Sequence, residues 1–228
     1  IQEDADIAIC AYRRLSGRSA QIEMNHLGRT TYEIKKHMDI LPVINTAIWN
    51  KLIRRELALV EANFEKNPRV AEDMMYMLHV YAKSEKITFV NVPLYEYIVG
   101  KESAMTYVLE REMIDIMNAM VKTKNNILLR VNEKKQWKNV MALFAMIHLG
   151  VSLPLRLETK GLFDFCQKGM RIWEWMSEEF PEWRNNIYVS SKNLYKVRML
   201  VGFEKSHVLN ILIYLYRKMP IKIGMIGW

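Results

Sequence analysis

The sequence predicts an α/β first half followed by a helical second half, and three observations support this. Residues 4–12 form an apolar run flanked by acids, which is typical of a buried strand. Residues 72–92 combine a helical pattern with a β-branched run, a helix-then-strand unit suited to the flank of an α/β sheet. From residue 108 onward, helical patterns follow without another strand pair. We therefore expect an α/β domain over 1–107 and a helical subdomain over 108–228.

The local signals after the opening strand are mixed. A polar loop is expected at 13–19, which contains a Ser-Gly turn signal. Residues 32–41 have the pattern of a short helix that Pro42 would stop. The segment 46–59 also has helical spacing, and the segment 62–70 contains Asn-Pro and is expected to be a loop.

The helix expected from residue 72 begins with two acids, Glu72 and Asp73, which suit the positive end of the helix dipole. Its apolar face is formed by Met74, Met77, Leu78, Tyr81 and Ala82. A strand follows at 86–92, and Pro93 is expected to end it because proline cannot donate to a strand ladder.

Four helices are expected in the second half, at 110–130, 135–149, 162–179 and 192–219. Two prolines, at 154 and 181, fall between them, as helix breakers should. The third helix has the clearest apolar stripe: Leu162, Phe165, Cys166, Gly169, Met170, Trp173 and Met176. The aromatic residues Trp173, Trp175, Phe180 and Trp183 are interpreted as packing residues, with a platform for an acceptor molecule as the alternative.

The chain has 228 residues, half of them hydrophobic, which is enough to bury a sizeable core. It begins with Ile1 and opens directly on a strand, so we expect a fragment of a longer chain. Cys10 and Cys166 are the only cysteines and lie in apolar stretches. Two buried thiols are expected rather than a disulfide framework or a zinc site, and the five histidines have no metal-ligand spacing.

The net charge of +8 is concentrated at the C-terminal end. Residues 184–228 contain eight Lys or Arg and one acid, which leaves +7 in that stretch. A basic, aromatic segment attracts anions such as phospholipid, nucleic acid or a phosphorylated substrate.

The longest apolar run of this segment, 208–216, has nine residues, whereas a membrane span needs about 20. We expect no transmembrane segment. A non-catalytic basic binding module for nucleic acid or an anionic membrane is the alternative function.

Glu72 and Asp73 are the strongest candidates for chemistry. At a helix start their side chains can face an open pocket while the helix holds them rigidly. A carboxylate in that place can take the proton of a hydroxyl group as its oxygen attacks an electrophilic carbon. Taken alone, the two acids are explained more simply by the helix dipole and by solvation.

Five short segments occur in one order between residues 48 and 106. They are 48–57 (Ile-Trp-Asn-Lys-Leu-Ile-Arg-Arg-Glu-Leu), Phe64, 72–76 (Glu-Asp-Met-Met-Tyr), 90–97 (Val-Asn-Val-Pro-Leu-Tyr-Glu-Tyr) and 103–106 (Ser-Ala-Met-Thr). This order resembles family 2 glycosyltransferases of bacterial surface-polysaccharide (capsule or cell-envelope) synthesis. Those enzymes commonly show a Trp-Asn-Lys-Leu-like helix, an isolated Phe, a Glu-Asp motif, a Pro-Leu-Tyr-x-Tyr strand and a Ser-x-x-Thr-like turn.

The resemblance implies the C-terminal portion of a GT-A (Rossmann-like) fold and an inverting transfer from a nucleotide-sugar donor to a glycan or lipid-linked acceptor. Asp73 would match the general base, with Glu72 beside it. The substrate site would be lined by Asn50, Lys51, Tyr95, Tyr97, Ser103 and Thr106. Lys51 is equally explained as a solvated helix lysine, and the two tyrosines as packing residues on one strand face. Where many relatives have an arginine after the second strand tyrosine, this chain has Ile98.

The family's metal-binding Asp-x-Asp motif would hold Mn²⁺ or Mg²⁺ and the donor diphosphate, and it is expected upstream of the opening strand. Asp4-Ala5-Asp6 has the right letters but leads into that strand, so we interpret it as a coincidence. The resemblance therefore implies that the nucleotide-binding half is missing, that this chain alone binds no metal, and that it is inactive as a fragment. We expect a cytoplasmic location, with peripheral contact of 184–228 to the inner membrane face. Nucleic acid is the less favoured partner because no nucleic-acid-binding motif is present.

Overall fold

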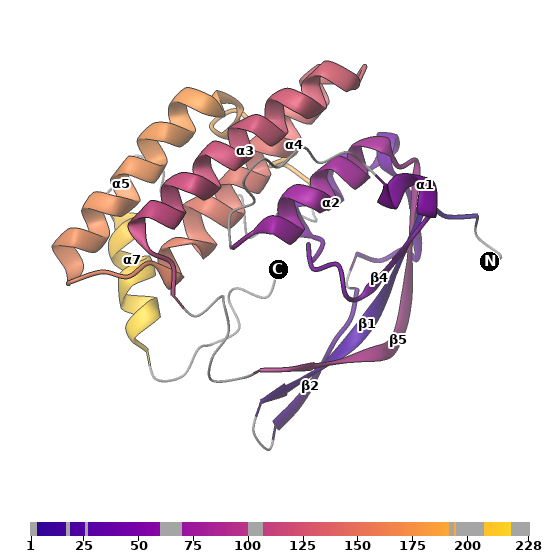
Figure 1. The fold of residues 1–228 in the computed structure, drawn as a ribbon, viewed down its shortest axis with the longest axis horizontal. Coiled ribbons are helices and arrows are strands. Elements are labelled where there is room, and N and C mark those ends of the chain that lie inside the picture. Colours follow the sequence, from indigo (N-terminus) through magenta and orange to yellow (C-terminus); the bar gives the residue numbers. More distant parts are fainter. Residues whose placement is uncertain are drawn as a thin grey trace. The chain divides into compact units, whose positions relative to one another are not determined.

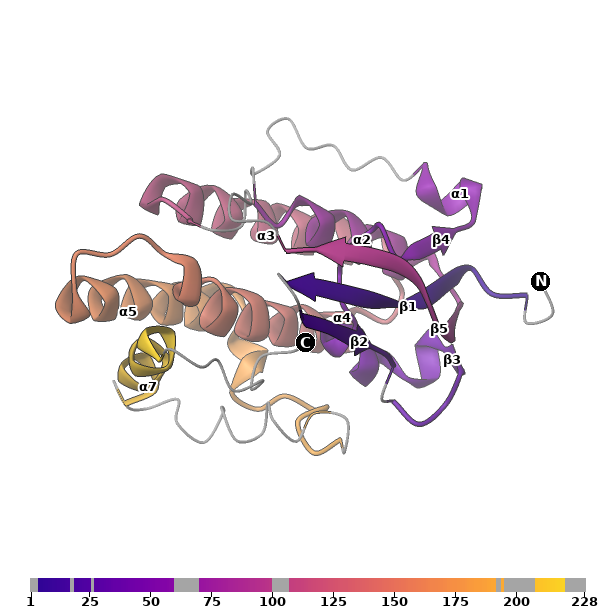
Figure 2. The same cartoon turned by 90° about the horizontal axis from the view of Figure 1, so that it is seen from below.

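The computed structural model describes residues 4–16, 19–25, 27–59, 70–99, 107–191, 194 and 208–219 (Figures 1 and 2). The chain forms two compact units. The first comprises Ile1–Met38 and Asn45–Ala104, and the second comprises Asp39–Ile44 and Met105–Trp228. The short segment 39–44 thus belongs to the second unit, although it lies within the sequence of the first.

The first unit contains a mixed five-stranded sheet. Its strands are β1 (Ile7–Ser16), β2 (Ser19–Glu23), β3 (Thr31–Glu33), β4 (Lys51–Ile53) and β5 (Lys86–Ile98). The order is β2-β1-β5-β3, and β4 also pairs with β1. Only β1 and β5 run parallel, and the other pairs are antiparallel. The helix α2 (Glu72–Lys83) lies on one face of this sheet (Figure 1).

The opening strand is confirmed, but it is longer than predicted. Residues 13–16 were expected to be a loop and instead continue β1, because they pair with β2 on one side and β5 on the other. Ser16 lies opposite Ser19 at the end of the pairing between β1 and β2. Arg13 lies opposite Glu96 in the register of β1 and β5, and the two side chains form an ion pair with 2.8 Å from Nη1 to Oε1.

The prediction that Pro93 ends its strand is wrong, because β5 continues to Ile98. The register shifts at this point, so that Cys10 lies opposite Val90 and Ala11 opposite Pro93. A bulge in β5 therefore precedes the proline. A proline is tolerated at such an irregularity because no ladder hydrogen bond from its nitrogen is required there.

Two predicted helices between the opening strand and residue 59 are also wrong. Residues 32–41 form the end of β3 and two 3-10 segments, η1 (Ile34–Lys36) and η2 (Met38–Val43), with Pro42 inside the second. The segment 46–59 forms β4 and a single helical turn, α1 (Arg55–Ala58). At residues 32–33 and 51–53 strand pairing, of β3 with β5 and of β4 with β1, overrides a weak helical spacing.

The helix α2 confirms the prediction that Glu72 and Asp73 occupy a first helical turn. Its buried residues include Met74, Met77, Leu78 and Tyr81, four of the five members of the expected apolar face, whereas Ala82 is half-buried. The predicted loop at 62–70 lies outside the described residues, except for Val70.

The second unit is helical, as predicted. The helices α3 (Glu110–Arg130) and α5 (Leu162–Glu179) have the predicted bounds. The helix α4 (Lys134–Phe144) continues into a π-helical stretch, η3 (Ala145–Ser152). Short 3-10 segments begin at the two prolines, η4 (Pro154–Arg156) and η5 (Pro181–Trp183). A single parallel bridge joins Val108 to Leu157, where no strand contact was expected.

The fourth predicted helix is described only in part. Helix α7 (Val208–Lys218) lies within the expected range 192–219, of which residues 192, 193 and 195–207 fall outside the described part of the chain. It packs against α5 around a cluster of Val151, Phe165, Leu209 and Ile213.

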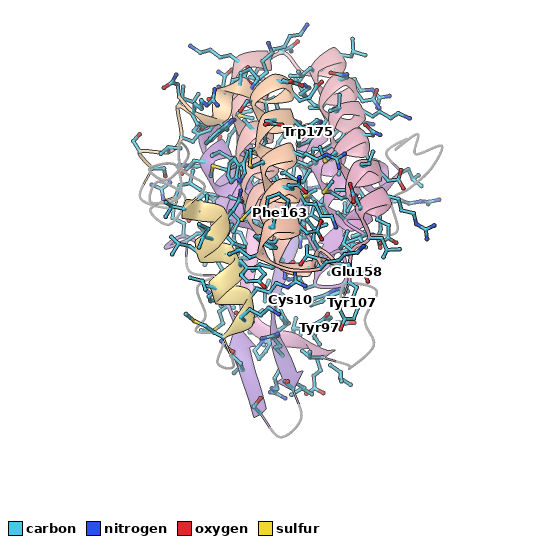
Figure 3. The ribbon with its side chains drawn as sticks, turned by 90° about the vertical axis from the view of Figure 1, so that its left-hand side faces the viewer. Cys10, Tyr97, Tyr107, Glu158, Phe163 and Trp175 are labelled. Atoms are coloured by element: carbon cyan, nitrogen blue, oxygen red, sulfur yellow. The ribbon has the colours of Figure 1, made fainter. Side chains whose placement is uncertain are left out.

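The apolar stripe predicted on α5 is partly correct. Phe165, Gly169 and Met176 are buried, but Leu162 and Met170 are exposed, and Ile172 is buried instead. The packing interpretation of the aromatic residues is favoured, because Phe180 and Trp183 are each 1% exposed. The labelled Phe163 and Trp175 can be followed along α5 in Figure 3.

Two smaller expectations also change. Cys10 and Cys166 are free thiols but half-buried rather than buried. In the part of the chain that the structure describes, one helical segment, Lys134–Arg156, is long and apolar enough to cross a membrane, and 78% of its apolar window is buried inside the structure. Its burial explains its hydrophobicity as that of a core helix.

Candidate functional site

Asp73 stands at the beginning of α2, next to a strained backbone position. The residue immediately before the helix, Ala71, has φ 70° and ψ 15°, the left-handed region that residues other than glycine rarely adopt. Glu72 is exposed and Asp73 is half-buried. The Asp73 Oδ2 accepts a hydrogen bond from the backbone N–H of Ile48 at 3.4 Å. The carboxylate of Asp73 is thereby tied to the segment 45–50.

The side chain of Lys51 also binds the segment 45–50. Its ammonium donates to the carbonyl oxygens of Asn45, at 2.6 Å, and Ala47, at 2.5 Å. It also donates to Oδ1 of Asn50 at 2.9 Å. Three acceptors match the three N–H groups of an ammonium. Lys51 is therefore not the solvated helix lysine of the alternative interpretation, because it lies on strand β4 with its head group enclosed by oxygens.

The pKa of Lys51 reflects this enclosure. Burial lowers it from 10.5 to about 7, and the electrostatic interaction with Asp73 opposes that shift. Burial disfavours the ammonium because the group loses its hydration, whereas a nearby carboxylate favours it. Close to neutral pH, Lys51 can therefore gain or lose a proton within the segment that contacts Asp73.

Asn50 and Asn45 anchor the same segment to the sheet. Asn50 is 4% exposed, and its Nδ2 donates to the Cys10 carbonyl at 3.2 Å while the Cys10 N–H donates to the Asn50 carbonyl at 3.0 Å. Asn45 donates to the Tyr12 hydroxyl at 3.3 Å and accepts the Ala47 N–H at 2.8 Å. The segment 45–50 is irregular, but its backbone is held at many points.

An aromatic cluster lies next to this segment. The Trp49 ring stacks on Tyr97, with centroids 5.1 Å apart and planes 8° apart, and on Tyr95, with centroids 4.5 Å apart and planes 24° apart. Tyr12 meets Trp49 edge-on at 4.8 Å. Tyr95 remains 38% exposed. Burial raises the pKa of Tyr12, and the charge of Glu23 adds to that shift. Exposed aromatic faces of this kind can pack against the C–H face of a sugar ring.

Six of the eight site residues predicted from the sequence lie in the described part of the first unit. Segment 45–50 brings Asn50, Lys51 and Asp73 together, and its Trp49 contacts Tyr95 and Tyr97. Glu72 is adjacent along α2. Ser103 and Thr106 lie outside the described residues. Sequence reasoning missed the positions of Trp49, Tyr12 and Asn45 in this site, although Trp49 opens the Trp-Asn-Lys-Leu motif.

Asp4 and Asp6 have structural partners. Arg54 forms ion pairs with both, and the Asp6 Oδ2 accepts the backbone N–H groups of Glu85, at 2.6 Å, and Lys86, at 3.2 Å. These contacts fasten the start of β1 to the start of β5.

Over the described ranges, no group of three or more His, Cys, Asp or Glu side chains is placed to hold a metal ion.

A comparison with solved structures identifies a similar fold. The crystal structure of Staphylococcus aureus TarS residues 1–349 in complex with UDP-GlcNAc matches 95% of this chain with a TM-score of 0.55 and 15% sequence identity. The chain spans 58% of that TarS chain. No family model matches the sequence, and no curated protein matches it either. The mixed α/β architecture of the chain is that of a glycosyltransferase-like fold.

Proposed function

We propose that this chain is the acceptor-side part of an inverting, family 2 type nucleotide-sugar glycosyltransferase, with Asp73 as the general base. One observation carries the proposal: a half-buried carboxylate at a helix start contacts the segment that also presents Lys51 and the aromatic cluster. The fold supports the same class, because the similar TarS chain is in complex with a nucleotide sugar.

In the proposed reaction, the acceptor hydroxyl hydrogen-bonds to a carboxylate oxygen of Asp73. The oxygen of that hydroxyl attacks the anomeric carbon of the donor while its proton passes to Asp73. The bond from the anomeric carbon to the diphosphate breaks with its electron pair, and the nucleoside diphosphate leaves. Attack opposite to the leaving group inverts the anomeric centre. Glu72, one residue earlier and exposed, would contact solvent or acceptor hydroxyls.

The acceptor would be a glycan or a lipid-linked sugar. Tyr95 offers an exposed ring face at the edge of the aromatic cluster, and the Trp49 ring behind it holds that face in place. Asn50 and Lys51 would act mainly by fixing the segment 45–50, since their polar atoms are occupied by protein partners. Ser103 and Thr106 would complete the site.

The proposal places the nucleotide and its Mn²⁺ or Mg²⁺ on an Asp-x-Asp motif outside this chain. A bound cation would neutralise the departing diphosphate. Within this chain, Asp73 would accept the proton and the aromatic cluster would orient the acceptor.

A cytoplasmic location with peripheral membrane contact is part of the same proposal. Helix α7 buries Leu209, Asn210 and Ile213 and exposes Val208, Ile211, Leu212 and Leu215. An exposed apolar stripe within a segment of charge +7 is suited to the interface of an anionic bilayer.

The test is acceptor-dependent release of nucleoside diphosphate by the natural full-length protein. UDP-GlcNAc is the first donor to supply, followed by other UDP-sugars, with a mixture of glycan and lipid-linked acceptors. We expect release above the rate without acceptor for at least one donor. Salt-dependent binding to duplex DNA, together with no binding of any nucleotide sugar, would favour the alternative of a basic binding module.

A further inference from the structure

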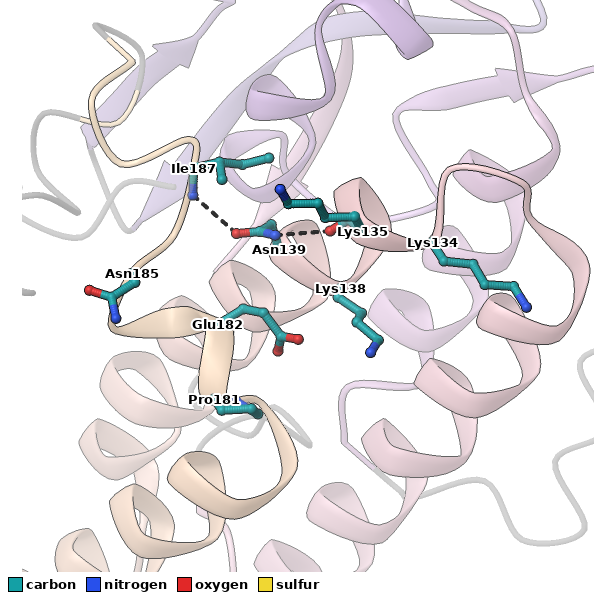
Figure 4. Close-up of a pocket in the computed structure, with 8 residues that line it drawn as sticks. All are labelled: Lys134, Lys135, Lys138, Asn139, Pro181, Glu182, Asn185 and Ile187. Carbon is teal, nitrogen blue, oxygen red and sulfur yellow. Dashed lines mark hydrogen bonds between the residues drawn. The ribbon is translucent and has the colours of Figure 1, made fainter.

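A second site lies within the helical unit, in a cavity of about 670 Å³. It opens between the first turns of α4 and the segment that begins at Pro181 (Figure 4). One wall is formed by three lysines of α4, Lys134, Lys135 and Lys138. Nothing in the proposed transfer reaction uses this cavity.

The three lysines are exposed and have no acidic partner. Across the described residues, none of them takes part in an ion pair. Glu133 is the N-cap residue of α4, and the first turn itself contains no acid, so Lys134 and Lys135 lie near the positive end of the helix dipole. Glu182 is the one acid that lines the cavity, against three lysines. The lining of the cavity therefore carries more positive than negative charge, which an anionic ligand would neutralise.

One residue that lines the cavity, Asn139, has a buried amide whose hydrogen bonds are satisfied. Asn139 is 3% exposed, and its Nδ2 donates to the Lys135 carbonyl at 2.9 Å while its Oδ1 accepts the Ile187 N–H at 3.0 Å. The Nδ2 of Asn186 donates to the Asn139 carbonyl at 2.8 Å. These bonds tie α4 to the segment on the other side of the cavity. The site is formed before any ligand binds.

The opposite wall has a different chemistry. Pro181 and Ile187 supply apolar surface, and Glu182 and Asn185 supply a carboxylate and an amide. A pyranose ring needs this combination, because its C–H faces pack on apolar groups while its hydroxyls hydrogen-bond to carboxylates and amides. The volume of the cavity lies within the range of pockets for small organic ligands. It is much larger than the volume that a single phosphate ion requires.

We propose that this cavity binds a saccharide that carries at least two negative charges, as carboxylate or phosphate groups. Its charged groups would contact Lys134, Lys135 and Lys138, and its ring would lie against Pro181 and Ile187. A role of this saccharide as part of the acceptor would rest on the proposed glycosyl transfer, whereas its binding in this cavity does not. Binding itself requires neither donor nor metal.

The test is a titration of the 228-residue chain with its lysines carrying ¹³C-dimethyl groups, which keep their charge. The probes are trigalacturonic acid, neutral maltotriose and inorganic phosphate. We expect trigalacturonic acid to shift the three lysine signals saturably. Maltotriose should leave them unchanged, and phosphate should bind at least tenfold more weakly. Substitution of each lysine by arginine identifies its signal.

The double variant Lys135→Gln/Lys138→Gln should weaken trigalacturonic acid binding by about tenfold, since two exposed ion pairs with its carboxylates are lost. Lys122→Gln, at an exposed and unpaired lysine of α3, is the matched control and should leave binding unchanged. An equal loss in the control, equal binding of maltotriose or phosphate, or no saturable shift would overturn the assignment. A failure of glycosyl transfer would leave these binding results untouched.

Discussion

Lys51 shows how one charged group can organise a site that has little regular structure. Its ammonium fixes two backbone carbonyls of the segment 45–50, and that segment places Trp49 on the tyrosines of β5 and an N–H on Asp73. The enclosed position lowers its pKa to about 7. The protonation of Lys51 is therefore coupled to the stability of the fold.

This coupling predicts a pH dependence with a definite sign. Between the folded pKa of about 7 and the unfolded pKa near 10.5, the unfolded chain binds more protons at Lys51 than the folded chain does. The contribution of Lys51 to the free energy of unfolding should therefore rise with pH across this window and be flat below it. The measurement is urea unfolding at several pH values from 6 to 10.

Other groups also titrate in that pH range. The relevant quantity is therefore the difference in the free energy of unfolding between the wild-type protein and a variant at Lys51. Lys51→Met has no titrating group, and Lys51→Arg stays charged throughout the window. Relative to either variant, the wild-type protein should gain stability between pH 7 and pH 10. Parallel curves for all three proteins would show that Lys51 has an ordinary pKa.

The strained residue before α2, two positions ahead of Asp73, gives a second prediction. Ala71 has a left-handed backbone, which costs about 1–2 kcal/mol for a residue with a Cβ atom. Ala71→Gly removes this strain but adds about 0.4–1 kcal/mol of unfolded-state entropy. A modest net stabilisation in urea unfolding is expected. The control Ala82→Gly, within α2, should destabilise by about 1 kcal/mol. Equal destabilisation by both variants would contradict the assigned backbone geometry.

At the scale of elements, the contact of α5 with α7 depends on one glycine. A Cβ atom at Gly169 would lie 2.6 Å from Oδ1 of Asn210, which is 4% exposed. Gly169→Ala should therefore destabilise the fold by about 1–3 kcal/mol, as overpacking of a close contact does. Thermal or urea unfolding measures this change.

Two further variants separate the contact from a general effect of alanine. Gly161 precedes α5 in an extended conformation with nothing within 4 Å of its Cβ position, so Gly161→Ala should be tolerated. Asn210→Ala should partly rescue Gly169→Ala, because it removes the clashing amide, and the coupling of the two changes is then non-additive. If the effects of Gly169→Ala and Asn210→Ala on stability were additive, Gly169→Ala would not act through its contact with Asn210.

The elements that the sequence predicts well are those that carry their own signal. The long amphipathic patterns of α3 and α5 led to the correct bounds, and the paired acids correctly marked the start of α2. The sequence does not predict the strand β4, because its three residues become a strand only through pairing with β1. The extension of β5 past Pro93 likewise depends on a bulge against β1 that no local pattern encodes.

The candidate site was predictable in composition but not in arrangement. A family-like order of motifs pointed to Asp73, Asn50 and Lys51, and to the tyrosines of β5. The stacking of Trp49 on both rings follows from the conformation of an irregular segment held by tertiary hydrogen bonds of a lysine. Such a conformation has no periodicity, so propensities and spacing could not reveal it.

At the scale of the whole molecule, the uneven charge predicts binding to membranes. The 228-residue chain should co-sediment with vesicles that contain anionic phospholipid and much less with neutral ones, and salt should weaken the interaction. The exposed stripe of α7 should contribute, so Leu212→Glu/Leu215→Glu should reduce binding severalfold. Leu129→Glu, at an 82% exposed residue of α3, serves as the control. Equal binding by all three proteins would exclude α7 from the contact.

The central claim is that Asp73 accepts the proton of the acceptor, and one comparison tests it most directly. In the natural full-length protein, the single-turnover rate of sugar transfer should fall by about 10²–10⁴-fold in Asp73→Asn, while the affinity for the donor stays within a fewfold of wild type. Asp115→Asn, at an exposed residue of α3, should transfer at the wild-type rate. Near-normal transfer by Asp73→Asn would contradict the account and remove Asp73 from the role of base.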